Sequence, residues 1–264
     1  NELDYLQRKF RWAQYHNLDL YVVDNMSTDG TYEFLIQKNI PNHRVDTNST
    51  FDLVTLQNHV TQVIHTIKPA WVIYHGADLF FYTEHGIRKN IEEAEIQGFN
   101  RITLNNFSMG RTEKDPQQGL EPNKHFYYFD DGGLELICKY DPSLTITADS
   151  IFINNPKDKI IPREKGFMVN WGPTKSLLNR KETMQRRTKA WTENRMSKEM
   201  GTHYTLLDKV NWLIPSYHLQ DIRTHALFLK FNAEMNLIWS PSPTRTFGQQ
   251  RSVRRLRNKY RRRS

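Results

Sequence analysis

The stretch Tyr21-Val-Val-Asp24-Asn25-Met26-Ser27-Thr28-Asp29-Gly30-Thr31 decides the fold that we expect for this chain. An apolar run ends in an acidic residue, a polar turn follows, and a helix is predicted to begin near Gly30, with Ser27 and Asp29 as candidate caps. In α/β sheets, ligands bind where the carboxyl end of a strand meets the amino end of the next helix. The stretch therefore predicts a binding turn, in which Asp24 can accept hydrogen bonds from a base or a ribose.

Helical and strand patterns alternate along the first 105 residues. Helical patterns cover residues 1–17, 32–38, 51–67 and 86–97, and strand-like apolar runs cover residues 18–24, 44–46, 71–74 and 101–105. Such alternation predicts an α/β fold with a mostly parallel sheet and crossover helices.

The second half of the chain has a different pattern. We expect a long loop over 109–125, strands over 134–140 and 151–154, and a basic helix over 174–199. Asp130-Asp131-Gly132-Gly133 is a possible acidic site, but a hairpin turn is the favoured interpretation.

The turn at Asp24 resembles the nucleotide-sugar-binding turn of family-2-type glycosyltransferases, usually written Asp-Asn/Asp-Gly-Ser-Thr-Asp-Gly-Thr. Met26 stands where that pattern has glycine. The resemblance implies a GT-A-like (Rossmann-like) sheet flanked by helices, with a helical C-terminal part. It also implies three regions: a nucleotide-sugar-binding half over 1–107, an acceptor-side half of the same domain over 108–240, and a basic tail over 241–264.

The same resemblance places Asp24, Asn25, Ser27 and Asp29 in the donor-binding turn. Asp24 would hold the base or ribose, since Ser27 and Asp29 are the better-placed helix caps and leave Asp24 without a local structural role. Asn1-Glu2 and the helix after it resemble the loop and helix that follow the family's first strand. We therefore expect that strand to be missing from this sequence; a rearranged sheet is the alternative.

A second motif, His75-Gly-Ala-Asp78-Leu-Phe80, follows the strand predicted over 71–74. It resembles the family's metal motif Asp-Ala-Asp-Glu-Phe, with Gly76 in place of the first aspartate and Leu79 in place of the glutamate. The resemblance implies that Asp78 binds Mn²⁺ or Mg²⁺ bridging the donor diphosphate, with His75 as a further candidate ligand. A histidine satisfied by backbone groups is an equal alternative for His75.

The remaining candidates lie in the second half. An inverting sugar transfer needs a base to take the acceptor proton, and among Asp130, Asp131, Asp149 and Glu164 we select Asp149. By the same resemblance, His203 could complete the metal shell or contact phosphate, and a role without function is an equal alternative for it. Arg187, on the preceding helix, would suit pairing with the diphosphate. For Arg187 a solvated helix face is the competing interpretation.

The net charge of +8 belongs to the end of the chain. Residues 251–264 contain eight basic side chains and no acidic one, and the other 250 residues carry 29 basic and 29 acidic residues. Such a tail could contact anionic membrane lipids; nucleic acid is the less favoured partner, and a solvated terminus is the simplest interpretation. The lone Cys138 excludes an internal disulfide. We expect a cytoplasmic protein, with membrane association through the tail as an option.

The resemblance therefore implies a glycosyltransferase that moves a sugar, favoured as a UDP-sugar, to a polysaccharide or glycoconjugate acceptor, with inversion. The alternative is a glycosyltransferase-like binding protein that has lost its metal site, because the motif at Asp78 lacks its usual carboxylate partners.

Overall fold

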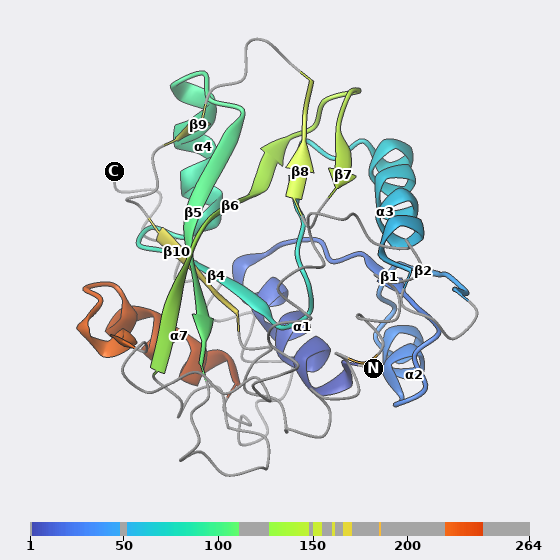
Figure 1. The fold of residues 1–264 in the computed structure, drawn as a ribbon, viewed down its shortest axis with the longest axis horizontal. Helices are drawn as coiled ribbons and strands as arrows, with labels where there is room; N and C mark the ends of the chain where they lie inside the picture. Colours follow the sequence, from blue (N-terminus) through green and yellow to red (C-terminus); the bar gives the residue numbers. More distant parts are fainter. Residues whose placement is uncertain are drawn as a thin grey trace, which may run out of the picture.

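The computed structural model describes residues 2–47, 52–110, 127–147, 150–154, 160–161, 166–170, 185 and 220–239. Within these ranges the chain is a mixed α/β protein, as predicted (Figure 1). Its described strands form a pair, β1 (Val22–Asp24) with β2 (Asn42–Arg44), a seven-stranded sheet, and a second pair, β7 (Thr145–Thr147) with β8 (Ser150–Phe152).

The first helix, α1 (Leu3–His16), joins the β1–β2 pair to the rest of the molecule. Its buried residues are Tyr5, Leu6, Lys9, Trp12 and Ala13, which form one face at helical spacing. The helix ends at Asn17, which adopts the left-handed conformation common at helix C-termini. Leu6 packs on Leu35 and Ile40, which lie in the segment connecting β1 to β2. Figure 1 shows α1 between α2 and the larger sheet.

Strands β1 and β2 are parallel, with Val23 opposite His43 and Asp24 opposite Arg44. Two helices cover this pair: α2 (Thr31–Gln37), which connects the strands, and α3 (Leu53–Ile67), which follows them. Neighbouring residues of a strand point to opposite faces. Because Arg44 stacks on Tyr32 of α2 while His43 contacts His59 of α3, the two helices lie on opposite faces of the pair.

The seven-stranded sheet has the order β11 (Gln220–Asp221), β6 (Tyr127–Lys139), β5 (Arg101–Met109), β10 (Gly166–Asn170) and β4 (Leu79–Thr83). In addition, β3 (Trp71–Ile73) pairs with β6, and β9 (Ile160–Ile161) pairs with β5. Only the β5–β10 and β5–β9 pairs are parallel. The expectation of a mostly parallel sheet is thus corrected, because β6 runs antiparallel to each of its partners β3, β5 and β11.

The prediction of a hairpin turn at Asp130–Gly133 is wrong, because these residues lie inside β6. Gly133 pairs with Asn105 and Asp130 pairs with Phe107, and the register shifts between these two points. An irregularity of this kind, a β-bulge, accepts glycine as readily as a turn does. The glycines therefore mark a local bend of a long strand.

The main core lies between the larger sheet and the helices α1, α4 (Ile87–Ile96) and α7 (Phe228–Trp239). A short 3-10 helix, η5 (Ile222–Thr224), precedes α7 and adds Ile222 to this core. Phe80 and Phe81 of β4 are almost completely buried there. No helix in the described ranges is long and apolar enough to cross a membrane. The loop and basic helix predicted over 109–125 and 174–199 lie almost entirely outside the described residues.

Candidate functional site

The turn after β1 is organised around Asp24. Its side chain is only 2% exposed. Both carboxylate oxygens accept the backbone N–H of Ser27, at 3.2 and 3.3 Å, and Oδ2 accepts a hydrogen bond of 3.2 Å from Nε of Arg44. The expectation that Asp24 has no local structural role is therefore corrected: it closes the turn and holds the Arg44 guanidinium.

Arg44 is a site residue that the sequence analysis did not identify. Its Nη2 donates to the Ser27 carbonyl at 3.1 Å, and its guanidinium lies 4.2 Å from the centre of the Tyr32 ring. The side chain is 34% exposed, so one face of a fixed cation reaches solvent beside the turn. The sequence analysis missed it because its role comes from the parallel register that sets Arg44 opposite Asp24, and β2 covers Asn42–Arg44 rather than the predicted residues 44–46.

Asn25 and Met26 occupy the middle of the turn, and only Met26 departs from the family pattern. Met26, which replaces the customary glycine, has φ of 46° and lies in the left-handed region. A residue with a side chain costs roughly 1–2 kcal/mol there, which accounts for glycine in the usual pattern. Asn25 is held by Thr47, whose hydroxyl donates to its side-chain oxygen at 2.8 Å.

Asp29 ties the turn to two helices. Its Oδ1 accepts from the backbone N–H and the hydroxyl of Thr31, at 3.2 and 2.6 Å, and its Oδ2 accepts from the N–H of Leu3 at 3.0 Å. Thr31 begins α2 and Leu3 begins α1, so the Asp29 carboxylate binds the first N–H group of each helix, although Asp29 itself lies one position before the N-cap of α2. Ser27 is not a cap, because the N-cap residue of α2 is Gly30. Burial raises the pKa of Asp29, but the hydrogen bonds from Thr31 and Leu3 outweigh it and hold that pKa below its ordinary value.

The second motif forms the turn between β3 and β4. His75 is half-buried; its Nδ1 lies 2.8 Å from the Gly76 carbonyl oxygen, and its ring packs on Phe81 and Trp12. Asp78 is also half-buried. A Cβ added at Gly76 would lie 2.9 Å from Oδ1 of Asp78. The carboxylate of Asp78 thus lies against the position where the family pattern has its first aspartate.

Lys9 of α1 is a second residue that the sequence analysis did not identify. It is 2% exposed, and its Nζ donates to the carbonyl oxygen of Leu79, the residue after Asp78. The ammonium lies 4.0 Å from the centre of the Phe80 ring and 5.0 Å from that of Trp12. Burial lowers the pKa of Lys9 well below its ordinary value, although the charge of Asp78 opposes this shift.

Lys9 also changes the electrostatics of His75. Burial is the main cause that lowers the pKa of His75, and the Lys9 charge lowers it further. The Gly76 carbonyl and Asp78 oppose the shift, and the net pKa lies well below the ordinary value. The imidazole is therefore neutral at physiological pH and can act as a hydrogen-bond partner or a ligand.

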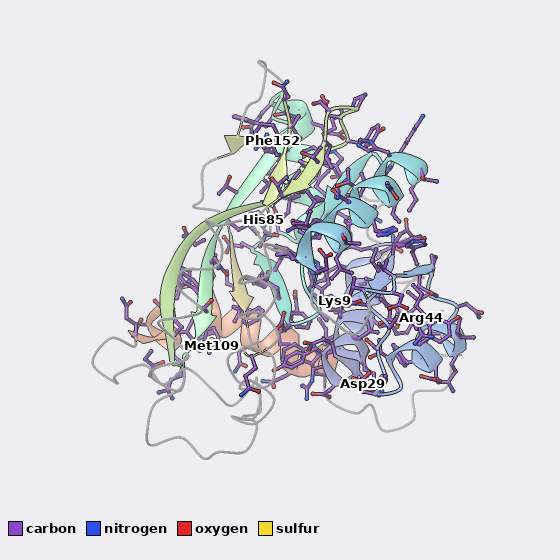
Figure 2. The ribbon with its side chains drawn as sticks, turned by 45° about the vertical axis from the view of Figure 1, so that its right-hand side comes forward. Lys9, Asp29, Arg44, His85, Met109 and Phe152 are labelled. Carbon is purple, nitrogen blue, oxygen red and sulfur yellow. The ribbon has the colours of Figure 1, made fainter. Side chains whose placement is uncertain are left out.

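One helix connects the two motif turns. Leu3 bonds to Asp29 in the first turn, and Lys9 bonds to Leu79 at the end of the second. Six residues of helix separate these contacts, a rise of about 9 Å. Figure 2 shows Lys9, Asp29 and Arg44 in the same part of the molecule, among α1, α2 and the β1–β2 pair.

Among the described residues, no three histidine, cysteine, aspartate or glutamate side chains come together as a metal-binding group. Asp78 and His75 are near each other but have no third such partner in that part of the chain. The other predicted site residues, Asp149, Arg187 and His203, lie outside the described residues. No protein-family model matches this chain, and no curated protein matches it.

Proposed function

We propose that the chain is a glycosyltransferase that binds a nucleotide-sugar donor at the two turns linked by α1. The observation that supports this most directly is that both turns follow the carboxyl ends of strands and are held by one helix, with about 9 Å of helix between the two contacts. In parallel α/β sheets ligands bind at the carboxyl ends of strands, and β1 and β2 form such a parallel pair.

The proposed roles differ between the turns. The nucleoside lies against the turn from Asp24 to Ser27, where the exposed face of the Arg44–Tyr32 stack offers a guanidinium for the base or a phosphate. Asp24 acts by holding Arg44 and the turn in place. At the second turn, Asp78 would hold a divalent cation, Mn²⁺ or Mg²⁺, which would neutralise the charge of the donor diphosphate.

For the transfer itself, a base takes the proton of the acceptor hydroxyl as its oxygen attacks the anomeric carbon from the face opposite the nucleotide. The bond from sugar to diphosphate breaks, and the nucleoside diphosphate leaves with the electron pair of that bond. A divalent cation held by Asp78 would stabilise the negative charge of this leaving group. Asp149 is the proposed base, and a glycan or glycoconjugate is the proposed acceptor.

The test is to measure UDP binding and UDP-sugar hydrolysis with and without Mn²⁺, for the wild type, Asp78→Ala and Arg44→Ala. We expect Arg44→Ala to weaken UDP binding at least tenfold, and Asp78→Ala to remove the effect of Mn²⁺. The matched control is Asp19→Ala, which removes an exposed acid outside both turns. Failure of UDP to bind the wild type, or equal binding by all variants, would refute the proposal.

A binding protein without catalysis is the second candidate. Lys9 brings a basic group next to Asp78, and Gly76 removes the usual second carboxylate. Both features weaken the attraction of the turn for a divalent cation. UDP binding without turnover, unaffected by Mn²⁺ and by Asp78→Ala, would favour this candidate over the enzyme.

A further inference from the structure

Two histidines meet on the face of the β1–β2 pair that α3 covers, opposite the Arg44–Tyr32 stack. His43 is in the middle of β2 and His59 is in the middle of α3. Nε2 of His43 and Nδ1 of His59 are 3.3 Å apart. His43 is exposed and His59 is half-buried, so solvent reaches the pair.

The separation of these nitrogens suits a shared metal ion. Zinc binds histidine nitrogen at about 2.0–2.1 Å. Two such bonds to atoms 3.3 Å apart meet at an angle of about 107°, close to the tetrahedral geometry that zinc adopts in proteins.

The orientation of the rings supports the same interpretation. The ring centres are 5.1 Å apart and the planes are inclined by 35°. A straight N–H···N hydrogen bond of this length would separate the centres by about 5.6 Å, because such a bond prefers donor and acceptor directions in line. The shorter separation means that the two ring nitrogens do not point directly at each other, so the contact is not a straight hydrogen bond.

We propose that His43 and His59 form a binding site for a borderline transition-metal ion, of the class Zn²⁺, Ni²⁺ or Cu²⁺. Imidazole nitrogens favour these ions, whereas Mn²⁺ and Mg²⁺ favour oxygen ligands. Water fills the other coordination positions, because no third metal-ligating side chain in the described ranges joins the pair. The bound ion fastens β2 to α3 and stabilises the fold by the free energy of binding.

The experiment is equilibrium binding of Zn²⁺ by calorimetry, with the thermal unfolding midpoint as a second readout. We expect the wild type to bind one Zn²⁺ at this site and to melt at a higher temperature with Zn²⁺ than with a chelator. His43→Ala and His59→Ala should each weaken binding at least tenfold and remove the thermal shift. His85→Ala is the matched control, because it removes an exposed histidine on the short β4–α4 connection.

Circular dichroism shows whether each variant is folded. If His43→Ala does not fold, His43→Gln replaces it, because His43 is the more exposed of the two histidines. Equal Zn²⁺ binding by the wild type and both folded variants would overturn the proposal, and so would absence of binding to the wild type. In that case the pair is a simple hydrogen bond. If Arg44→Ala loses UDP binding but still binds Zn²⁺, the histidine site is separate from the proposed donor site. If the wild type does not bind UDP, the proposed function fails while the proposal for the histidine pair still stands.

Discussion

The backbone N–H of Leu3 donates a 3.0 Å hydrogen bond to the carboxylate of Asp29, across 26 positions of the chain. The bond satisfies one of the free N–H groups at the start of α1, while the same carboxylate binds the start of α2 through Thr31. One acidic side chain thus fixes the turn after β1 to both helices.

Replacing Asp29 should loosen this junction. Asp29→Ala removes the acceptor for Thr31 and Leu3, and we expect it to lower the free energy of unfolding by about 0.5–2 kcal/mol, the range for losing a side-chain acceptor at a helix N-terminus. Urea unfolding measures this, with Asp19→Ala as an exposed control.

The contribution of Asp29 should also depend on pH. Its folded-state pKa is lower than the ordinary value of 3.8, so its stabilisation is fully present above that value and is lost as the pH falls through the folded pKa. Equal stability of the wild type and Asp29→Ala at neutral pH would contradict the junction.

Lys9→Met tests the buried amine. The folded-state pKa of Lys9 lies well below 10.5, so between these two values the unfolded chain holds a proton that the folded chain has released. Stability in the wild type should therefore rise with pH over that interval, and Lys9→Met should remove this part of the rise. Unfolding curves at pH 7 and 9 measure the slope. Lys89→Met, at an exposed position of α4, should keep the wild-type slope; an unchanged slope in Lys9→Met would contradict the assignment.

His75→Gln tests the imidazole of the second turn. Because the folded-state pKa of His75 is well below 6.5, the unfolded chain takes up a proton below pH 6.5 that the folded chain does not. The wild type should accordingly lose stability as the pH falls from 6.5 toward the folded pKa. Thermal midpoints from pH 7 to 5 should fall less steeply in His75→Gln, whereas the exposed control His85→Gln should follow the wild type.

Arg44 variants test the pair with Asp24. Arg44→Ala leaves a carboxylate that is 2% exposed without its charged donor, and we expect a loss of about 1–3 kcal/mol in stability. Arg44→Lys keeps the charge but loses the planar group that lies on Tyr32. Its free energy of unfolding should therefore lie between those of the wild type and Arg44→Ala. Lys38→Ala, which removes an exposed cation just after α2, is the control. No difference between Arg44→Ala and this control would mean that the Ser27 N–H satisfies the Asp24 carboxylate without Arg44.

The periodic elements of the first hundred residues were predictable because local pattern determined them. The apolar faces of α1 and α3 repeat at helical spacing, and β1 and β3 are short runs of bulky residues bounded by polar turns. The strand β4 was missed, because Leu79 to Thr83 is buried at every position and has no alternation to distinguish it.

Long-range pairing and the buried polar groups were not predictable in the same way. Nothing local shows that β6 continues through Asp130 and Gly133, since its register comes from pairing with β5. Lys9 lies on the apolar face of α1, but a lysine is usually exposed; only the Leu79 carbonyl explains its burial. Arg44 likewise gains its role from the parallel register that sets it opposite Asp24.

The contact between Gly76 and Asp78 has a consequence for redesign. Gly76→Asp would place an aspartate beside Asp78, because the added Cβ would lie 2.9 Å from Oδ1 of Asp78, and two neighbouring carboxylates repel each other. A divalent cation between them would turn that repulsion into attraction. The substituted protein would therefore be less stable than the wild type in a chelator and would regain stability with Mn²⁺, which makes its folding conditional on the ion.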